Sequence, residues 1–237
     1  MRPVVHIIGD VVTAMKPSVS VDCDWIIDTS TWSISGFDST RLYFVGQKMK
    51  YIGTNPAVTA YVTITAIGDN ALVVSSTIDL GSTKNKGTIQ PVINYHFGHG
   101  AEIVNTFSEI TKNASYKKEQ FPAICLIQDF PEAVKKSDGY ECEASLNIVI
   151  LTDSKQKYKA ADRYANTFKP ILYPLYDLFI DRLRNSTEIA PDYPEHTKTD
   201  RLFWGKSGLY GNSGNIFNDY IDAIELENLK VKIFKTC

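Results

Sequence analysis

A glycine-rich segment near the C-terminus is the first place where the sequence offers chemistry. Residues 203–217 read FWGKSGLYGNSGNIF and contain Gly205-Lys206-Ser207, the last three residues of a phosphate-binding P-loop motif. The first glycine of that motif is replaced by Asp200, whose carboxylate would lie where a phosphate needs bare backbone. The residues that follow alternate as in a strand and do not open a helix. The sequence therefore argues against a nucleotide site, and we predict no bound cofactor.

The same segment carries aromatic side chains that its own sheet has little room to cover. Aromatic residues on glycine-rich segments are typical anchors of subunit interfaces. We therefore predict that the segment docks on a neighbouring subunit through Phe203, Trp204, Tyr210 and Phe217.

Two close histidines, His96 and His99, form the only pair of neighbouring imidazoles, and Glu102 has the spacing of a third metal ligand. Zinc needs three or four convergent ligands with their own hydrogen-bond partners. A glycine-flanked turn without another nearby cysteine or histidine does not promise them. A turn at a hairpin end or at an interface is the favoured alternative, and we predict no metal site.

Acidic residues gather in two clusters. The first contains Asp22, Asp24 and Asp28, and the second Asp219, Asp222, Glu225 and Glu227. A glycosidase would need two such carboxylates across a cleft, but a solvated strand edge or loop is the simpler interpretation. The sequence also lacks the G-x-S-x-G, H-E-x-x-H and Cys–His signatures of common hydrolases. We predict no catalytic residue and no enzyme activity.

Composition narrows the class of protein further. The 237 residues are 43% hydrophobic and 22% charged, as in ordinary globular proteins. A formal charge of −2 gives no overall attraction to DNA phosphates. No apolar run approaches the ~20 residues of a membrane span, and the N-terminus lacks a convincing signal peptide. We expect a protein made and used without crossing a membrane.

The first half of the chain predicts one helix followed by strands. Residues 4–15 place apolar side chains on one helical stripe. Residues 19–100 are rich in Ser, Thr and short apolar runs, and residues 59–78 read as a hairpin with its turn at 68–70. We predict that 19–100 form a compact β-module, a small barrel.

The second half predicts a sheet covered by helices. We expect a short helix within 101–118, a central strand at 121–127, a half-buried strand at 140–151 and a final strand at 229–233. The helical stretch 160–184 contains Pro170 and Pro174, and we expect these prolines to bend or split it near Lys169, into 160–168 and 170–184. The fold class is thus α+β: residues 1–18 and 101–237 form a small mixed, mainly antiparallel sheet flanked by helices, with the all-β module 19–100 inserted.

This order of elements, with FPAI at 121–124, ILYP at 171–174 and the ending from Trp204 to Ile233, resembles the tail terminator or tail completion proteins of tailed bacteriophages. The resemblance covers the first helix and residues 120–237. It implies a short helix before a small mixed α/β sheet and a helix across one face. It also implies a closed ring of identical subunits around the DNA channel.

The inserted module is the main departure from that family. Its Lys-, Asn-, Ser- and Thr-rich loops resemble proteins of phages that infect Bacteroidetes, including the crAss-like group. The resemblance implies a six-fold or twelve-fold ring in the virion neck or tail, assembled in the host cytoplasm. Such a ring contacts portal, connector or tail proteins and lets DNA pass without sequence-specific binding. The alternative is a carbohydrate- or peptide-binding module, or a polysaccharide-active enzyme, that presents Asp22, Asp24 and Asp28.

Overall fold

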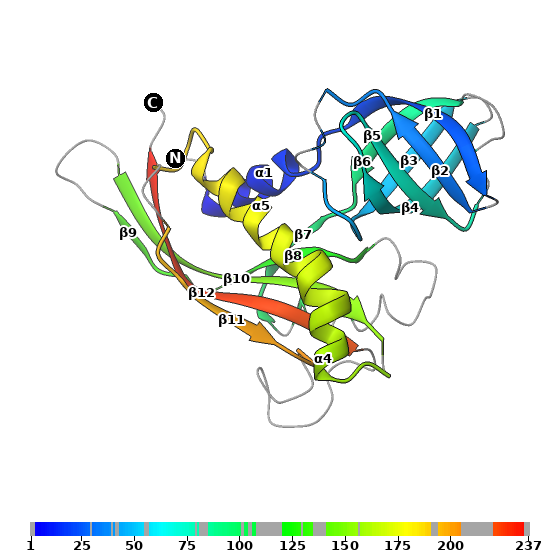
Figure 1. Cartoon of the computed structure of the whole chain (residues 1–237). Helices are drawn as coiled ribbons and strands as arrows, with labels where there is room; N and C mark the ends of the chain where they lie inside the picture. Colours follow the sequence, from blue (N-terminus) through cyan, green and yellow to red (C-terminus); the bar gives the residue numbers. More distant parts are fainter. Residues whose placement is uncertain are drawn as a thin grey trace. The chain divides into compact units, whose positions relative to one another are not determined.

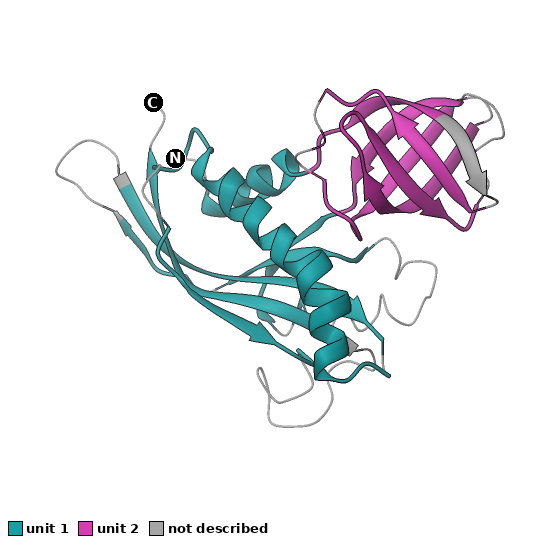
Figure 2. Ribbon diagram, in the orientation of Figure 1, with its two compact units in different colours: residues 1–15, 93–237 teal, residues 16–92 magenta. Residues whose placement is uncertain are grey.

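The chain folds into two compact units. Unit 1 contains residues 1–15 and 93–237, and unit 2 contains residues 16–92 (Figure 2). The computed structural model describes residues 3–28, 30–38, 40, 43–54, 57–78, 80, 85–100, 102–103, 106–107, 120–128, 130–134, 141–155, 157–190, 194–204 and 220–234. Unit 2 is the inserted β-module, and it spans residues 16–92, whereas the range predicted from the sequence was 19–100.

Helix α1 (Val4–Ala14) opens unit 1, close to the predicted range. Pro3 precedes it with extended dihedral angles, φ −62° and ψ 141°, which suit the start of a helix. One stripe of the helix is buried and packs against α5 (Tyr173–Arg184) and the sheet of unit 1. The buried stripe consists of Val4, Ile7, Ile8, Val11 and Val12.

Unit 2 is a closed antiparallel β-barrel in which the strands pair in the order β1-β2-β5-β4-β3-β6 (Figure 1). The hairpin predicted for 59–78 is β4 followed by β5, so that prediction is confirmed. The strands are β1 (Val19–Asp28), β2 (Thr31–Ser35), β3 (Lys48–Thr54), β4 (Ala57–Ile67), β5 (Ala71–Ser76) and β6 (Asn85–Pro91).

Side chains fill the interior of the barrel. Alternate residues of each strand point inward, and the buried set includes Trp32, Met49 and Tyr51. The Tyr51 hydroxyl donates a hydrogen bond to the Asn85 carbonyl at 3.2 Å. Strands β3 and β6 approach so closely that a Cβ on Gly87 would lie 2.3 Å from the Ile52 carbonyl oxygen. The interior is therefore a packed core.

Unit 1 is built on a mixed sheet with the strand order β11-β12-β10-β8-β7, and β9 also pairs with β10. Strand β7 runs parallel to β8, and the other pairs are antiparallel. The predicted α+β class with a mixed, mainly antiparallel sheet is thus observed. The strands are β7 (Asn94–Gly98), β8 (Ala123–Ile127), β9 (Glu132–Val134), β10 (Glu141–Ser154), β11 (Thr197–Arg201) and β12 (Tyr220–Phe234).

A continuous helical run crosses one face of this sheet (Figure 1). It comprises α4 (Ala160–Arg163), the π-helix η1 (Tyr164–Leu172) and α5. Of the two outcomes expected near Lys169, a split is wrong, because the run is continuous from Ala160 to Arg184. Pro170 has no N–H to donate, and the wide turns of η1 absorb it: the Tyr173 N–H donates to the Phe168 carbonyl, five residues back.

The two faces of the sheet have separate apolar covers. Buried residues of the helical run, among them Phe168 and Leu172, lie against β10 and β12. On the other face, Ile103, Phe107 and Trp204 belong to a cluster with alternate residues of β8, β10 and β12. Residues 102–103 and 106–107 are helical, as predicted, whereas most of 101–118 lies outside the described residues.

None of the helices in the described part of the chain combines the length and apolar character that a membrane crossing requires. Cys125 of β8 and Cys142 of β10 are buried. Burial raises the pKa of the Cys125 thiol well above its usual range.

Candidate functional site

The strongest candidate for a functional site is the base of the glycine-rich segment. The chain leaves the sheet after Trp204 and returns at the start of β12, and the Trp204 N–H donates to the Ile221 carbonyl at 2.8 Å. The two ends of the segment are therefore adjacent. Residues 205–219, which include Lys206, Tyr210 and Phe217, lie outside the described residues.

Trp204 fills the core of its own unit. Its side chain is 1% exposed, and its indole Nε1–H donates to Glu225 Oε1 at 2.8 Å. From the sequence, Trp204 was expected to offer apolar surface to a neighbouring subunit. That expectation is corrected at this residue, because a side chain already covered within its own chain offers no such surface.

Phe203 lies on the opposite face of the sheet from Trp204. Its backbone has a positive φ of 55°, an uncommon conformation for a residue with a side chain. Its N–H donates to Asp222 Oδ1 at 3.3 Å, and its ring stacks on the Arg163 guanidinium at 3.8 Å. Asp222 and Glu225 point to opposite faces of β12, so the two aromatic residues straddle the sheet edge.

A buried ion pair holds this corner together. Arg163 NH1 donates to Asp222 Oδ1 at 2.6 Å, and both side chains are fully buried. Two further nitrogens of the same guanidinium, Nε and Nη2, donate to the carbonyls of Tyr158 and Lys155, at 3.1 and 3.3 Å. Paired and hydrogen-bonded on several sides, the arginine meets the conditions under which a buried charge is tolerated.

Glu225 completes the arrangement on the other face. Its side chain is 5% exposed, and its second oxygen accepts a hydrogen bond from Arg201 Nε at 2.7 Å. We call Arg163, Phe203, Trp204, Asp222 and Glu225 the edge clamp. The interpretation of the second acidic cluster as a solvated edge is wrong for Asp222 and Glu225, because both are buried members of the clamp. Asp219 lies outside the described residues.

Asp200, at the position of the missing P-loop glycine, lies on β11. Its carboxylate accepts hydrogen bonds from the Tyr173 hydroxyl and from Lys198 Nζ. The neighbouring His196 contacts the Tyr176 hydroxyl at 2.9 Å. These contacts fasten the edge strand β11 to α5, and they occupy Asp200 in strand packing.

His96 lies on β7, and His99 is the first residue after this strand. Burial lowers the pKa of His96, whose ring meets Phe107 edge-on at a centroid distance of 5.0 Å. The backbone N–H of His99 donates to Glu102 Oε2 at 3.2 Å. Glu102 thus closes the turn at the end of β7. Within the described part of the chain, no group of three or more His, Cys, Asp or Glu side chains converges as a metal site would require.

The first acidic cluster lies on β1 of the barrel. Asp22 is exposed and sits opposite Lys86 of β6 in the strand register. The side chains of Asp24 and Asp28 lie outside the described residues. Because the barrel interior is a packed core, a ligand of this module would have to bind its outer surface.

Unit 1 also has a pocket of about 610 Å³ beside the C-terminal end of α5, which we call the α5 groove. Its lining includes the buried residues Ala144, Leu183, Ile189, Ala190 and Val231. The exposed part of the lining carries charges of both signs, from Glu132, Arg184, Glu195 and Lys230 among others. The volume falls within the range of small-molecule and side-chain sites.

No protein family, curated protein or solved structure matches the chain.

Proposed function

We propose that the chain is a structural subunit of a phage virion, a neck or tail ring around the DNA channel that joins portal or connector to tail components. The edge clamp carries this proposal. In the clamp, two buried carboxylates, a buried arginine and a buried tryptophan hold both ends of one segment in place. Anchoring of this kind fixes the position from which a binding segment extends.

The arrangement of unit 1 supports the proposal. A short helix precedes the sheet, the sheet is mixed, and a helical run packs across one face. These are the features that the resemblance to tail terminator proteins implies. The likeness lies in the order and packing of these elements, and the ring is our inference from that likeness.

The barrel supports a contact role for unit 2. Its interior is filled, and two chain crossings attach it to unit 1, at 15–16 and 92–93. Large apolar side chains lie exposed on its outside, where a partner surface would cover them. These are Val45, Ile52, Ile67 and Ile78, which are 38–49% exposed.

Charge is consistent with a channel protein. The formal net charge of −2 is spread over 25 basic and 27 acidic residues. A chain close to neutral has little overall attraction for DNA phosphates, whereas a strongly basic one would hold them.

Electron microscopy of the purified chain tests the proposal. We expect particles with a central hole and six-fold or twelve-fold symmetry in class averages of negatively stained protein. A uniform population of single chains at micromolar concentration, with no rings, would contradict it.

A further inference from the structure

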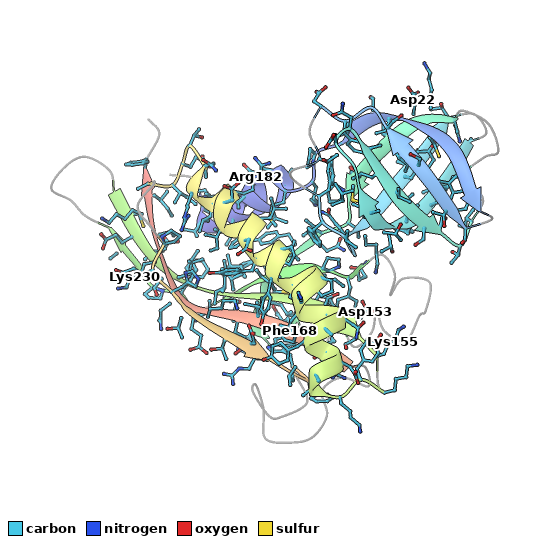
Figure 3. All side chains as sticks on the ribbon, in the orientation of Figure 1. Asp22, Asp153, Lys155, Phe168, Arg182 and Lys230 are labelled. Carbon is cyan, nitrogen blue, oxygen red and sulfur yellow. The ribbon has the colours of Figure 1, made fainter. Side chains whose placement is uncertain are left out.

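The connection between β10 and the helical run carries three exposed lysines, Lys155, Lys157 and Lys159, which we call the basic turn. None of their ammonium groups forms an ion pair with a carboxylate of a described residue. By contrast, Lys230 at the other end of the sheet pairs with Glu195 at 3.2 Å. Figure 3 shows Lys155 and Lys230 toward opposite ends of unit 1. The basic turn is therefore a patch of uncompensated positive charge.

Two aspartates flank the basic turn along the chain. Asp162 Oδ2 accepts a hydrogen bond from the backbone N–H of Lys159 at 3.1 Å, so it caps the start of the helical run. Asp153 is half-buried at the end of β10. Three lysines against two aspartates leave residues 153–162 with a net positive charge, whereas the whole chain has a formal charge of −2.

The buried arginine of the edge clamp braces the basic turn. The Tyr158 N–H donates to the Lys155 carbonyl at 3.0 Å, which closes the turn. Arg163 Nε and Nη2 donate to the carbonyls of Tyr158 and Lys155, and the same guanidinium is paired with Asp222. The backbone that presents the lysines is thus fixed before any ligand binds, which lowers the entropy lost on binding.

The side chains of the turn indicate the chemistry of a ligand. Each ammonium is a compact charge that donates hydrogen bonds and accepts none, so it suits phosphate oxygens. Lys155 Nζ lies over the Tyr158 ring, 5.6 Å from its centroid, so this face of the ring is covered. Proteins that bind single strands stack bases on open aromatic rings. The basic turn therefore fits the phosphates of a duplex better than the bases of a single strand.

We propose that the basic turn contacts the phosphate backbone of double-stranded DNA. The inference rests on the proposed function for its choice of partner, and it names the surface of the subunit that faces the DNA in the channel. A duplex presents one negative charge per ~1.7 Å of its axis, so three ammonium groups meet several phosphates in any sequence. Because the rest of the chain adds no net attraction, the contact is weak and allows the DNA to slide.

The salt dependence of DNA binding tests the contact. The full chain is titrated into a fluorescently labelled duplex of mixed sequence, and anisotropy gives the binding constant K at several NaCl concentrations. Each phosphate contact contributes about −0.9 to the slope of log K against log salt concentration. The variant with Lys155→Gln, Lys157→Gln and Lys159→Gln should therefore lose about 2.7 of this slope per bound subunit, and it should bind about tenfold or more weakly at low salt.

A charge-matched variant provides the control. Lys50→Gln, Lys86→Gln and Lys230→Gln remove the same charge from β3, β6 and the far end of β12, and they should leave the slope unchanged. Thermal unfolding followed by circular dichroism checks that both triple variants are folded. Single Lys→Gln variants of the basic turn should each reduce the slope by about 0.9, which gives a second measurement on nearly unchanged proteins.

The outcomes separate this contact from the ring. Equal losses in the two triple variants, or an unchanged slope without the three lysines of the turn, would overturn the contact, and rings seen by mass photometry would still stand. Lysine-dependent binding to phosphatidylglycerol vesicles with unchanged binding to DNA would also overturn it. A chain that stays monomeric but loses the predicted slope with the basic turn would overturn the ring and support the contact.

Discussion

Arg163 and Asp222 form a 2.6 Å ion pair in which both side chains are fully buried, although 59 positions separate them in the sequence. The pair joins the start of the helical run to the start of β12. Together with the Phe203 N–H on the same carboxylate oxygen, it fixes where the segment 205–219 leaves the sheet.

Removing the charge of Asp222 should destabilise unit 1 severely. In Asp222→Asn the Arg163 charge stays buried without its counter-ion, which costs about 3–5 kcal/mol. Urea unfolding followed by circular dichroism measures the loss. The double variant Arg163→Met with Asp222→Leu removes both charges and should recover most of it. A loss below about 1 kcal/mol for Asp222→Asn would show that the pair contributes little.

Trp204 should matter for stability before it matters for assembly. Trp204→Ala leaves a cavity in the core and should lower the free energy of unfolding by about 3–5 kcal/mol. Trp204→Phe keeps most of the volume but leaves Glu225 Oε1 without its donor, at a cost of about 1–3 kcal/mol. If Trp204→Ala kept full stability and only dissociated the oligomer, the tryptophan would be an interface residue after all.

Gly87 is the backbone position on which closure of the barrel depends. An alanine there would place its Cβ 2.3 Å from the Ile52 carbonyl oxygen, so β3 and β6 must separate, at a cost of about 3 kcal/mol. Hydrogen exchange of peptides from β3 to β6 should accelerate in Gly87→Ala. At Gly68 the nearest atom to an added Cβ lies 3.5 Å away, so Gly68→Ala is the matched control. Equal exchange in both variants would contradict the close approach.

Alkaline pH should weaken the fold through Cys125. Its thiol has a raised pKa when folded, so the unfolded chain releases this proton first. The free energy of unfolding then falls as pH rises above about 8.5, by about 1.4 kcal/mol per pH unit for this group. Cys125→Ala should show a shallower fall between about pH 8 and 10 than the unchanged protein. Identical slopes would mean that the thiol is accessible to water.

Unit 1 should fold without the barrel. The inserted residues 16–92 form their own core, and α1 packs on the sheet of unit 1. A chain in which a short Gly-Ser linker joins residues 15 and 93 should keep cooperative unfolding and resist limited proteolysis. Rapid digestion of this variant under conditions that spare the full chain would show that the units depend on one another.

The elements that the sequence predicted are those with a regular apolar pattern. Buried and less buried residues alternate in the hairpin β4–β5, every residue of the central strand β8 is buried, and α1 buries one helical stripe. Strand β11 reads TKTDR and has no apolar alternation, since it is a polar edge strand. Its pairing with β12 follows from tertiary structure that the local pattern does not carry.

The candidate site was only partly predictable. The glycine-rich segment stood out by composition, but the burial of Asp222 and Glu225 depends on partners distant in the sequence. Asp222 pairs with Arg163, which lies 59 positions earlier in the sequence. Glu225 accepts a hydrogen bond from Trp204, which lies 21 positions earlier. A run of carboxylates reads as solvated unless those partners are known. The signal that could have found the clamp is Asp222 within an otherwise apolar strand pattern.

Mass photometry of three proteins tests the central claim most directly. The unchanged chain should give one species of six or twelve times 26.5 kDa. Tyr210→Ala with Phe217→Ala should give single chains at the same concentration, because two predicted anchors of the subunit interface are gone. Lys206→Ala should assemble like the unchanged chain. A single-chain mass for the unchanged protein, or an intact ring without Tyr210 and Phe217 that Lys206→Ala disrupts, would contradict the account.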